Sequence, residues 1–346
     1  MGTIRNRRED IVILRLISMV MIILCHIIPF YKFIPGSQFL GQILSVGVNV
    51  FLMISGYIYG LKKTLEFPTW ILQRVRRIWV PVFLVVVVDL LVLVLFCSER
   101  FPLLTILVYC TNLQGLLFIN WDFFYRYIRE INNLGPLWFT TVIVFCYWLL
   151  PLFRYLDSRF RKTAVHGVIL AVFVALCIVL KIFCGMDLMY FAVFYLGFLL
   201  AARQDHEKKM RLSHYCILAA VVCLIQMGRL YLRSVIDGTT VYWAYISFSH
   251  LALGLLIFVT VMELGKRLPK LFEKIANLKI AVWMDKVSFY IFLTHGIFCM
   301  GRTNVFAWIP NPLVATPVFF GLVLIASLIL YWADTMFDRL FRKKPA

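Results

Sequence analysis

Apolar residues are gathered into ten long windows that short polar or charged segments separate. The windows cover approximately residues 10–30, 41–61, 78–97, 136–153, 165–183, 187–202, 213–232, 243–264, 284–301 and 313–334. Their lengths are close to the roughly 20 residues that a helix needs to cross a bilayer. The pattern therefore predicts an all-α polytopic membrane protein with about ten transmembrane helices.

An eleventh apolar stretch, residues 101–119, differs from these windows because polar and small residues interrupt it. They are Thr105, Thr111, Asn112, Gln114 and Gly115. Irregular or polar segments are tolerated in the membrane only where protein or water satisfies their polar groups. We therefore expect this stretch to lie in the interface or to re-enter the membrane, and not to cross it.

The composition excludes a soluble globular protein. Of the 346 residues, 62% are hydrophobic and 15% are charged, against roughly 45–50% apolar and 25% charged residues in soluble domains. Ten spans with short loops fill the chain, so we expect residues 1–346 to form a single membrane-embedded domain with no soluble domain. The net charge of +18 would suggest nucleic acid in a soluble protein, but so apolar a chain has little aqueous surface for that partner.

Basic residues are distributed unevenly between the two sides of the membrane that ten spans define. One side receives 26 Lys and Arg residues, in segments 5–8, 62–77, 154–162, 203–211, 266–286 and 339–344, and the other side receives eight. Cytoplasmic loops carry such an excess. We therefore predict cytoplasmic N- and C-termini, in a multi-pass protein of the cell membrane (plasma or inner membrane). If residues 101–119 crossed the membrane, every later loop would change sides and the alternation would be lost.

Few ionisable residues lie inside the predicted spans, and each is a candidate for function because a charge at the bilayer centre costs about 2.5–3.5 kcal/mol on insertion scales. The first span carries Arg15 and His26. At 100° and 1.5 Å per residue, they share one face of a helix and lie about 16 Å apart along its axis. The structural alternative is a snorkelling arginine and a histidine that only bonds a neighbouring helix.

Three later spans add Asp89, His250 and His295. The predicted topology places both histidines in the outer half of the membrane. Asp89 could orient a catalytic histidine, neutralise an arginine, or serve as a paired or protonated structural carboxyl. Its position in the sequence does not separate these roles.

A basic run, Arg74, Arg76 and Arg77, lies at the entry to the third span and is followed by Pro81. Guanidinium groups bind phosphates in a bidentate geometry that lysine lacks, so the run is a candidate polyanion site. Ordinary cytoplasmic positive charge is the alternative.

Several sequence patterns that carry other chemistries are missing. The chain has no G-x-S-x-G, G-x-x-x-x-G-K-[ST], G-x-G-x-x-G or H-E-x-x-H motif, and its nine cysteines form no C-x-x-C pair. Serine hydrolase, NTPase, dinucleotide and zinc chemistry are therefore disfavoured, and we expect no metal.

Five short motifs resemble, in the same order, those of the acyltransferase-3 family of integral-membrane O-acyltransferases. They are Glu9–Arg15 with His26, Gly47–Tyr57, Arg74–Pro81, Leu137–Phe139 and Ser288–His295. Together they extend from residue 9 to residue 295, and the ten predicted spans agree with the topology of the family.

The resemblance implies transfer of an acyl group, usually acetyl from cytoplasmic acetyl-CoA, to a hydroxyl of a bacterial cell-surface glycan or related acceptor. It also implies that Arg15, His26 and the run Arg74, Arg76 and Arg77 are essential. Two departures from the family pattern stand out. Asn49 replaces an acidic residue of many glycan-modifying members, and no extracytoplasmic hydrolase-like domain follows the last span. We therefore expect the transfer to be completed within the membrane domain.

The residue chemistry and the resemblance lead to one hypothesis. Arginines 15, 74 and 77, with Arg76 in the same run, hold the CoA phosphates while the thioester reaches His26. There His26 acts as general base on the acceptor hydroxyl, or takes the acyl group itself. Asp89 and His295 complete the expected catalytic set, and the expected substrate-binding residues are Trp138, Tyr290, Asn49 and Ser55.

The expected partners are a CoA thioester, an extracytoplasmic or lipid-linked glycan or other hydroxyl acceptor, and membrane lipids, with a homo-oligomer left open and nucleic acid excluded. One alternative is a polytopic transporter or flippase for a glycan or lipid precursor, in which membrane His and Asp residues relay protons. It would move substrate without consuming acyl-CoA. A second alternative is the unrelated membrane-bound O-acyltransferase superfamily, against which the Arg-to-His spacing of the first span argues.

Overall fold

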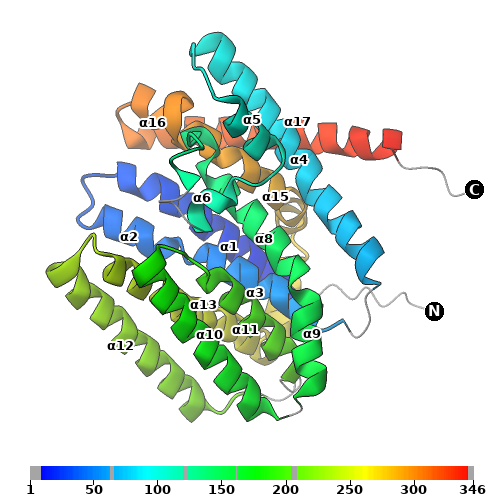
Figure 1. The fold of residues 1–346 in the computed structure, drawn as a ribbon, viewed down its shortest axis with the longest axis vertical. Helices are drawn as coiled ribbons and strands as arrows, with labels where there is room; N and C mark the ends of the chain where they lie inside the picture. Colours follow the sequence, from blue (N-terminus) through cyan, green and yellow to red (C-terminus); the bar gives the residue numbers. More distant parts are fainter. Residues whose placement is uncertain (1–8, 63–65, 120–123, 161, 204–208, 342–346) are drawn as a thin grey trace, which may run out of the picture. The chain divides into compact units, whose positions relative to one another are not determined.

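The computed structural model describes residues 9–62, 66–119, 124–160, 162–203 and 209–341 (Figure 1). Within these ranges the chain is helical and contains no β-strand. Some basic residues that the orientation argument counted lie outside the described residues: Arg5, Arg7, Arg8, Lys63, Arg161, Lys208, Arg342, Lys343 and Lys344.

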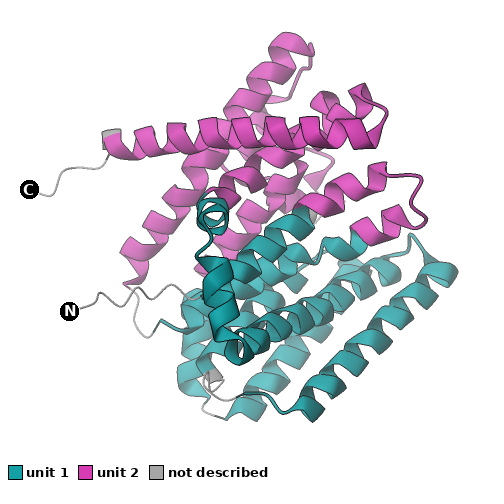
Figure 2. Cartoon of the chain, turned by 180° about the vertical axis from the view of Figure 1, so that it is seen from behind, with its two compact units in different colours: residues 1–22, 42–65, 149–286 teal, residues 23–41, 66–148, 287–346 magenta. Residues whose placement is uncertain are grey.

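The chain divides into two compact units, each assembled from separate stretches (Figure 2). Unit 1 comprises residues 1–22, 42–65 and 149–286, and unit 2 comprises residues 23–41, 66–148 and 287–346. Three helices contribute residues to both units: α1 (Glu9–Ile27), α2 (Ser37–Leu44) and α15 (Lys279–Cys299). The single domain expected over residues 1–346 stays a prediction.

Unit 1 is built around two apolar helices, α3 (Gly47–Gly60) and α11 (Met189–Arg203). Its other helices are α9 (Leu150–Arg159), α10 (Thr163–Cys184), α12 (Leu212–Ile236), α13 (Thr240–Arg267) and α14 (Pro269–Ala276). Helix α13 packs against α3, α10 and α12, and α10 packs against α11.

Glycines allow α3 and α11 to pack closely. A Cβ atom at Gly56 would lie 2.0 Å from the carbonyl oxygen of Phe194, and a Cβ atom at Gly197 would lie 2.2 Å from the carbonyl oxygen of Met53. Each glycine therefore faces the backbone of the partner helix. Small residues are the usual means of close helix packing in membranes, where lipid and side chains are equally apolar.

Unit 2 is organised around α4 (Phe67–Phe96), which packs against α5 (Leu103–Cys110), α8 (Trp138–Trp148) and α17 (Pro312–Phe341). Its shorter helices are α6 (Gly115–Ile119), α16 (Val305–Trp308) and the 3-10 helices η1 (Ile28–Phe30), η2 (Asn132–Leu137) and η3 (Gly301–Thr303). Helix α4 has 30 residues and continues through Pro81. At about 45 Å it exceeds the roughly 30 Å hydrocarbon layer, so the basic run at its start is helical and can reach the aqueous side.

Residues 101–119 form two short helices, α5 with eight residues and α6 with five. A helix of eight residues is only about 12 Å long, so neither helix can cross a bilayer. The polar residues between them bind the start of α8: the Gln114 amide donates to the carbonyl of Leu137 at 2.9 Å, and the backbone N–H of Gly115 donates to Thr141 Oγ1 at 2.9 Å. The polar positions that interrupt the apolar stretch thus hold it against the protein.

Eight helical segments of the described chain are long and apolar enough to cross a membrane. They are Glu9–Phe30, Ser37–Gly60, Phe67–Phe96, Asn132–Arg159, Thr163–Cys184, Leu212–Ile236, Thr240–Arg267 and Pro312–Arg339. The remaining two predicted windows form α11, which has 15 residues, and α15, which carries Asp285, Lys286 and His295. The all-α polytopic fold is therefore confirmed, while the count of ten and the side of each terminus stay predictions.

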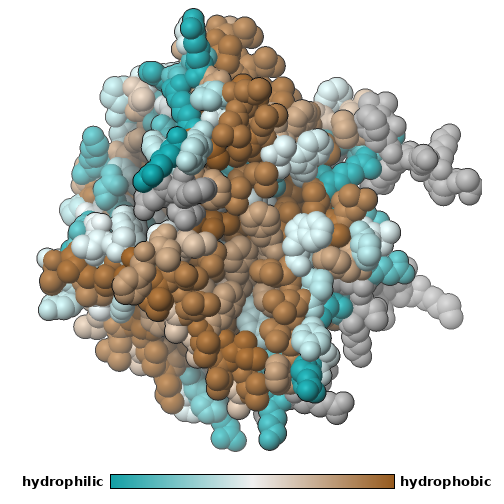
Figure 3. Space-filling view, in the orientation of Figure 1, coloured by the Kyte–Doolittle hydropathy of each residue, from teal (hydrophilic) through white to brown (hydrophobic). Residues whose placement is uncertain are grey.

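Several helices expose apolar faces. Val172 on α10 is 63% exposed, Leu224 on α12 is 65% exposed and Trp332 on α17 is 65% exposed. Figure 3 shows hydrophobic side chains over much of the visible face. Such surface would aggregate in water, and it suits contact with lipid.

Glu99 joins distant segments within unit 2. Its carboxylate accepts a hydrogen bond from Arg302 Nε at 2.8 Å and another from Arg129 Nη2 at 2.7 Å. The bond from Arg302 has the larger effect and the bond from Arg129 the next, and both lower the pKa of Glu99 below its usual value of 4.5 because they favour the ionised carboxylate. Arg129 also donates to the carbonyl of Arg100 at 2.6 Å, which ties the loop after α4 to the loop before η2.

We expect Gly56→Ala to lower the thermal unfolding temperature of the purified protein. The added methyl group would overlap a backbone oxygen that cannot move aside without separating α3 from α11, at a cost of about 1–3 kcal/mol. Gly167→Ala on α10 is the matched control, because nothing lies within 4 Å of its new Cβ. Equal losses in the two variants would contradict the close packing of α3 and α11.

The stability that Glu99 contributes should depend on pH. Because its folded-state pKa is lowered, the contribution is complete above the usual glutamate pKa of 4.5 and is lost as pH falls through the folded-state value. Glu99→Gln should therefore unfold at a lower temperature than the wild type at neutral pH, and the difference should shrink in acid. Glu273→Gln, at an exposed position of α14, serves as control; a pH-independent difference for Glu99→Gln would refute the ionic role.

Candidate functional site

Two predicted catalytic histidines from opposite ends of the chain meet in unit 2. His26 lies in the last turn of α1, and His295 lies on α15. Their ring centroids are 5.2 Å apart and their planes are inclined by 42°. The fold therefore places two imidazoles within reach of one reacting group.

The hydrogen bonds of His295 determine which nitrogen carries the proton. Its Nδ1 lies 2.6 Å from the carbonyl oxygen of Phe292. A carbonyl only accepts, so Nδ1 donates, and in the neutral ring Nε2 carries the lone pair. His295 is fully buried, and within the described part of the chain Nε2 has no hydrogen-bond partner. A buried imidazole nitrogen of this kind is able to accept a proton.

A series of aromatic contacts leads from His295 to α8. The Phe292 ring lies 5.6 Å from the imidazole, and Phe139 of α8 lies 5.3 Å from Phe292, centroid to centroid. Trp138, a predicted substrate-binding residue, lies 6.3 Å from Phe139. Trp138 thus belongs to the aromatic group that extends from α8 to His295 within unit 2.

Asp89, the third predicted catalytic residue, is buried on α4 and bonded to an asparagine. Asn133 Nδ2 donates to Asp89 Oδ1 at 3.1 Å and to Thr303 Oγ1 at 2.8 Å, and Asn133 Oδ1 accepts from the backbone N–H of Arg302 at 3.0 Å. Asn133 therefore connects α4, η2 and η3.

Asn133 also contacts the helix that carries His295. A Cβ atom at Gly296 would lie 2.8 Å from the carbonyl oxygen of Asn133, so α15 packs on the backbone of η2 immediately after the histidine. Through this packing Asp89 helps to hold the His295 segment, while the described hydrogen bonds of Asp89 include none to a histidine.

The basic run lies in the first third of α4. Arg76 and Arg77 are exposed and Arg74 is half-buried. Arg74 and Arg77, three positions apart, are neighbours on one helix face. Arg76 lies 4.0 Å from Asp338 of α17, an exposed pair that contributes little energy. Planar guanidinium donors at this end of unit 2 can bind an anion.

Tyr290, another predicted substrate-binding residue, lies on α15 but is bonded to α17. Its hydroxyl donates to Asp334 Oδ2 at 2.7 Å, and its ring lies 5.3 Å from that of Tyr331. Tyr290 and His295 are five residues apart, so at 100° per residue they project about 140° from each other. The structure therefore directs the hydroxyl to α17.

Arg15 lies in unit 1 and has an acidic partner. Its Nη1 is 3.0 Å from Asp285 Oδ1 on α15, and the two side chains are 32% and 15% exposed. The sequence predicted a cationic anchor for a phosphate at this position. Any anion that binds Arg15 has to compete with Asp285.

Asn49 and Ser55 lie on α3, also in unit 1, and both are buried. The Ser55 hydroxyl donates to the carbonyl of Phe51 on its own helix at 3.0 Å. The Asn49 side chain faces α13, where a Cβ atom at Gly254 would lie 3.2 Å from Asn49 Cβ. Both predicted substrate-binding residues therefore take part in helix packing.

His250, which the sequence singled out, pairs with an arginine in unit 1. Arg229 Nη1 lies 3.0 Å from His250 Nε2, and Arg229 is fully buried. A guanidinium group only donates, so His250 Nε2 accepts and the imidazole is neutral. Arg229, one of the eight basic residues assigned to the outer side, lies in α12.

Several partners of the predicted residues were absent from the predicted catalytic and binding set: Asn133, Asp285, Asp334 and Asp338. Asp285 and Asp334 fall inside the apolar windows 284–301 and 313–334, so the rule that singled out Asp89 would have found both. Asn133 is uncharged and lies outside the apolar windows, just before the one that begins at residue 136, so that rule does not single it out. Within the described residues, no group of three or more His, Cys, Asp or Glu side chains could hold a metal ion.

Comparison with known proteins agrees with the resemblance in the sequence. A family model described as an acyltransferase domain matches residues 8–332, nearly the whole chain. No curated protein and no solved structure matches the chain. The matched region includes Arg15, both histidines of the pair and the basic run of α4. The chain therefore belongs to the acyltransferase-3 family and is a multi-pass membrane acyltransferase.

Proposed function

We propose that this protein transfers an acetyl group from cytoplasmic acetyl-CoA to a hydroxyl of an extracytoplasmic or lipid-linked glycan, with His26 and His295 handling the proton. The contact between His26 and His295, in a chain of an acyltransferase family, carries the proposal. The resemblance of the sequence motifs suggests the acetyl donor and the glycan acceptor, and the histidine pair provides the base.

Acyl transfer from a thioester to a hydroxyl needs a base and produces a thiol. The acceptor O–H gives its proton to His26 as its oxygen forms the new ester bond to the acyl carbon. The carbon–sulfur bond breaks, and the CoA thiolate finally takes up the proton. His295 Nε2, which has a lone pair and lies beside His26, can take a proton from His26 and so spread the positive charge over both rings.

His26 has a second conceivable role as a transient acyl carrier. In that case the acyl group would move to an imidazole nitrogen and then to the acceptor oxygen, in two displacement steps. The neutral state of His295 suits either route, because an adjacent lone pair removes the proton that His26 releases.

The basic run of α4 suits the donor side of the reaction. CoA carries several phosphates, and Arg74, Arg76 and Arg77 offer planar bidentate donors at the exposed end of a helix. Arg76 contacts Asp338 only weakly, at 4.0 Å, so a phosphate can replace that carboxylate. In this proposal the run faces the cytoplasm, as do both termini, and the acceptor is bound from the other side of the cell membrane.

Membership of an acyltransferase family favours an enzyme over the transporter or flippase alternative. The two readings also differ in their products, because only the enzyme releases free CoA in proportion to the acylated acceptor.

We expect His26→Gln and His295→Gln to reduce acetyl transfer in proteoliposomes by roughly 10²- to 10⁴-fold, the usual contribution of a general base. The assay measures free CoA and labelled acetyl on extracted envelope glycan. His214→Gln, at an exposed position of α12, is the matched control. Full activity of His26→Gln would overturn the proposal, and acetyl label on the rapidly quenched wild-type protein would identify His26 as a carrier.

The double variant Arg74→Ala with Arg77→Ala should raise the KM for acetyl-CoA roughly tenfold or more, because charge-assisted hydrogen bonds contribute about 1.5–3 kcal/mol each. The kcat should change less, since in this proposal these residues bind the CoA phosphates and do not contact the reacting atoms. Arg126→Ala, an exposed arginine of the loop before η2, controls for the loss of positive charge. An unchanged KM would remove the run from the donor site.

A further inference from the structure

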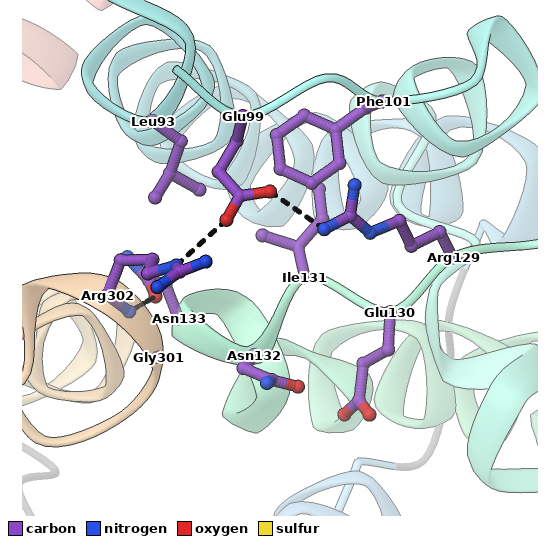
Figure 4. A pocket seen from close by; sticks show the side chains of 10 residues that line it. All are labelled: Leu93, Glu99, Phe101, Arg129, Glu130, Ile131, Asn132, Asn133, Gly301 and Arg302. Atoms are coloured by element: carbon purple, nitrogen blue, oxygen red, sulfur yellow. Dashed lines mark hydrogen bonds and ion pairs between the residues drawn. The ribbon is translucent and has the colours of Figure 1, made fainter. Parts of the chain in front are cut away.

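A polar cavity of about 340 Å³ lies in unit 2, at the end of α15 (Figure 4). Its charged and polar lining comes from three separate segments: the loop after α4, the loop before η2 with the first two residues of η2, and η3. The lining residues that matter here are Glu99, Phe101, Arg129, Glu130, Asn132 and Arg302. None of them was among the catalytic, donor-binding or substrate-binding residues that the sequence predicted.

The two arginines of the cavity are held in fixed positions. Figure 4 shows Glu99 between them, with its carboxylate bonded to Arg302 Nε at 2.8 Å and to Arg129 Nη2 at 2.7 Å. Arg129 also stacks on Phe101, with its guanidinium carbon 5.1 Å from the ring centroid. The remaining N–H groups of both arginines are oriented and exposed, since the side chains are 51% and 70% exposed.

Hydrogen-bond acceptors line another part of the same cavity. In Figure 4 the Glu130 and Asn132 side chains lie on the far side of Ile131 from Glu99. Glu130 Oε1 would lie 3.9 Å from a Cβ atom at Gly135, which places this carboxyl beside η2. Burial raises the pKa of Glu130 above its usual value of 4.5, because it disfavours the ionised carboxylate.

This lining matches a neutral polyhydroxylated ligand better than an anion. Each hydroxyl group both donates and accepts, and can therefore pair with a guanidinium on one side and a carboxyl or amide on the other. A phosphate or carboxylate only accepts, and it would lie near both glutamates. The two arginines and two glutamates of the lining nearly balance in charge. A volume of 340 Å³ corresponds to about eleven water molecules, which is room for a single sugar ring.

The cavity is joined to the histidine pair through α15 and Asn133. Gly301 and Arg302 follow His295 by six and seven residues, just beyond the end of α15 at Cys299. Asn133 lines the cavity, bonds Asp89 and the backbone of Arg302, and packs against Gly296 beside the histidine. Gly301 has φ +63, and a Cβ atom there would overlap Asn133 Oδ1, so this junction is closely packed. A ligand in the cavity therefore lies next to the end of the helix that carries His295.

We propose that this cavity is an acceptor subsite that binds one neutral pyranose ring of the glycan, adjacent to the sugar unit whose hydroxyl is acylated. The link to acylation rests on the proposed function, whereas binding of a neutral sugar by these residues does not. Arg302, Arg129, Glu130 and Asn132 supply the hydrogen bonds, and Glu99 positions the two arginines. The subsite sets affinity and selectivity for the acceptor and takes no part in bond making.

Binding is tested by saturation-transfer NMR on the full protein in lipid nanodiscs, which avoids sugar-headed detergents. The probes are the methyl pyranosides of glucose, galactose and mannose and N-acetylglucosamine, with glucuronate and glucose 6-phosphate as anionic counterparts. At least one neutral probe should bind the wild type. Asn132→Ala and Glu130→Ala should each weaken its binding roughly three- to tenfold, as expected for one lost hydrogen bond. Arg126→Ala, outside the cavity, should leave it unchanged.

The contrary outcomes are distinct. The subsite would be overturned if no neutral probe bound the wild type or if the anionic sugars bound more tightly than the neutral ones. It would also be overturned if both cavity variants bound the neutral probe as tightly as the wild type. Asn132→Ala also avoids the Glu99 bridge, so it tests the cavity without removing a structural contact. In acetyl-transfer assays it should raise the KM for the acceptor and leave kcat and the KM for acetyl-CoA unchanged. A protein that binds the sugar but transfers no acetyl group would refute the proposed function and leave the sugar site standing.

Discussion

The bilayer offers no hydrogen-bond partner, so polar groups within the helices depend on partners inside the protein. This constraint explains most of the intramembrane contacts. Asp89 is bonded to Asn133, Tyr290 to Asp334, Arg229 to His250, and Arg15 is paired with Asp285. The buried Nε2 of His295 is one of the polar atoms that no partner within the described residues reaches, and it lies beside a second imidazole. A lone pair left open in such surroundings, beside a second imidazole, is costly for stability and useful for chemistry.

The same constraint separates two kinds of polar site in unit 2. The histidine pair lies beside the ring of Phe292, which in turn packs against Phe139 of α8. The cavity at the end of α15 is lined instead by ionised and amide side chains with many fixed hydrogen bonds. One environment suits a reaction in which a proton moves, and the other suits recognition of hydroxyl groups. Asn133 belongs to both, because its side chain holds Asp89 and η3 while its backbone packs against Gly296.

Helix packing in unit 1 depends on shape more than on polarity. Gly56 and Gly197 bring α3 and α11 together so closely that a methyl group at either position would meet the partner backbone. Gly56 belongs to Gly47–Tyr57, one of the motifs that resemble the acyltransferase-3 family. Ser55 of the same motif donates a hydrogen bond to a carbonyl of its own helix. The motif is therefore explained at least partly by packing. Arg15, although expected at the donor site, is similarly engaged with Asp285.

The sequence alone determined the fold class, the approximate helices, the interruption at residues 101–119 and the family. A membrane span depends on the hydrophobicity summed over one window of residues, and a short motif is likewise a local feature of the sequence. It also singled out His26 and His295 as separate polar residues in apolar surroundings. Only the tertiary structure decided that these two rings are neighbours, that Asp89 is bonded to Asn133, and that Glu99, Arg129 and Arg302 enclose a polar cavity. Such pairings join segments far apart in the chain, and their energies depend on which helix faces meet, which no local window of the sequence specifies.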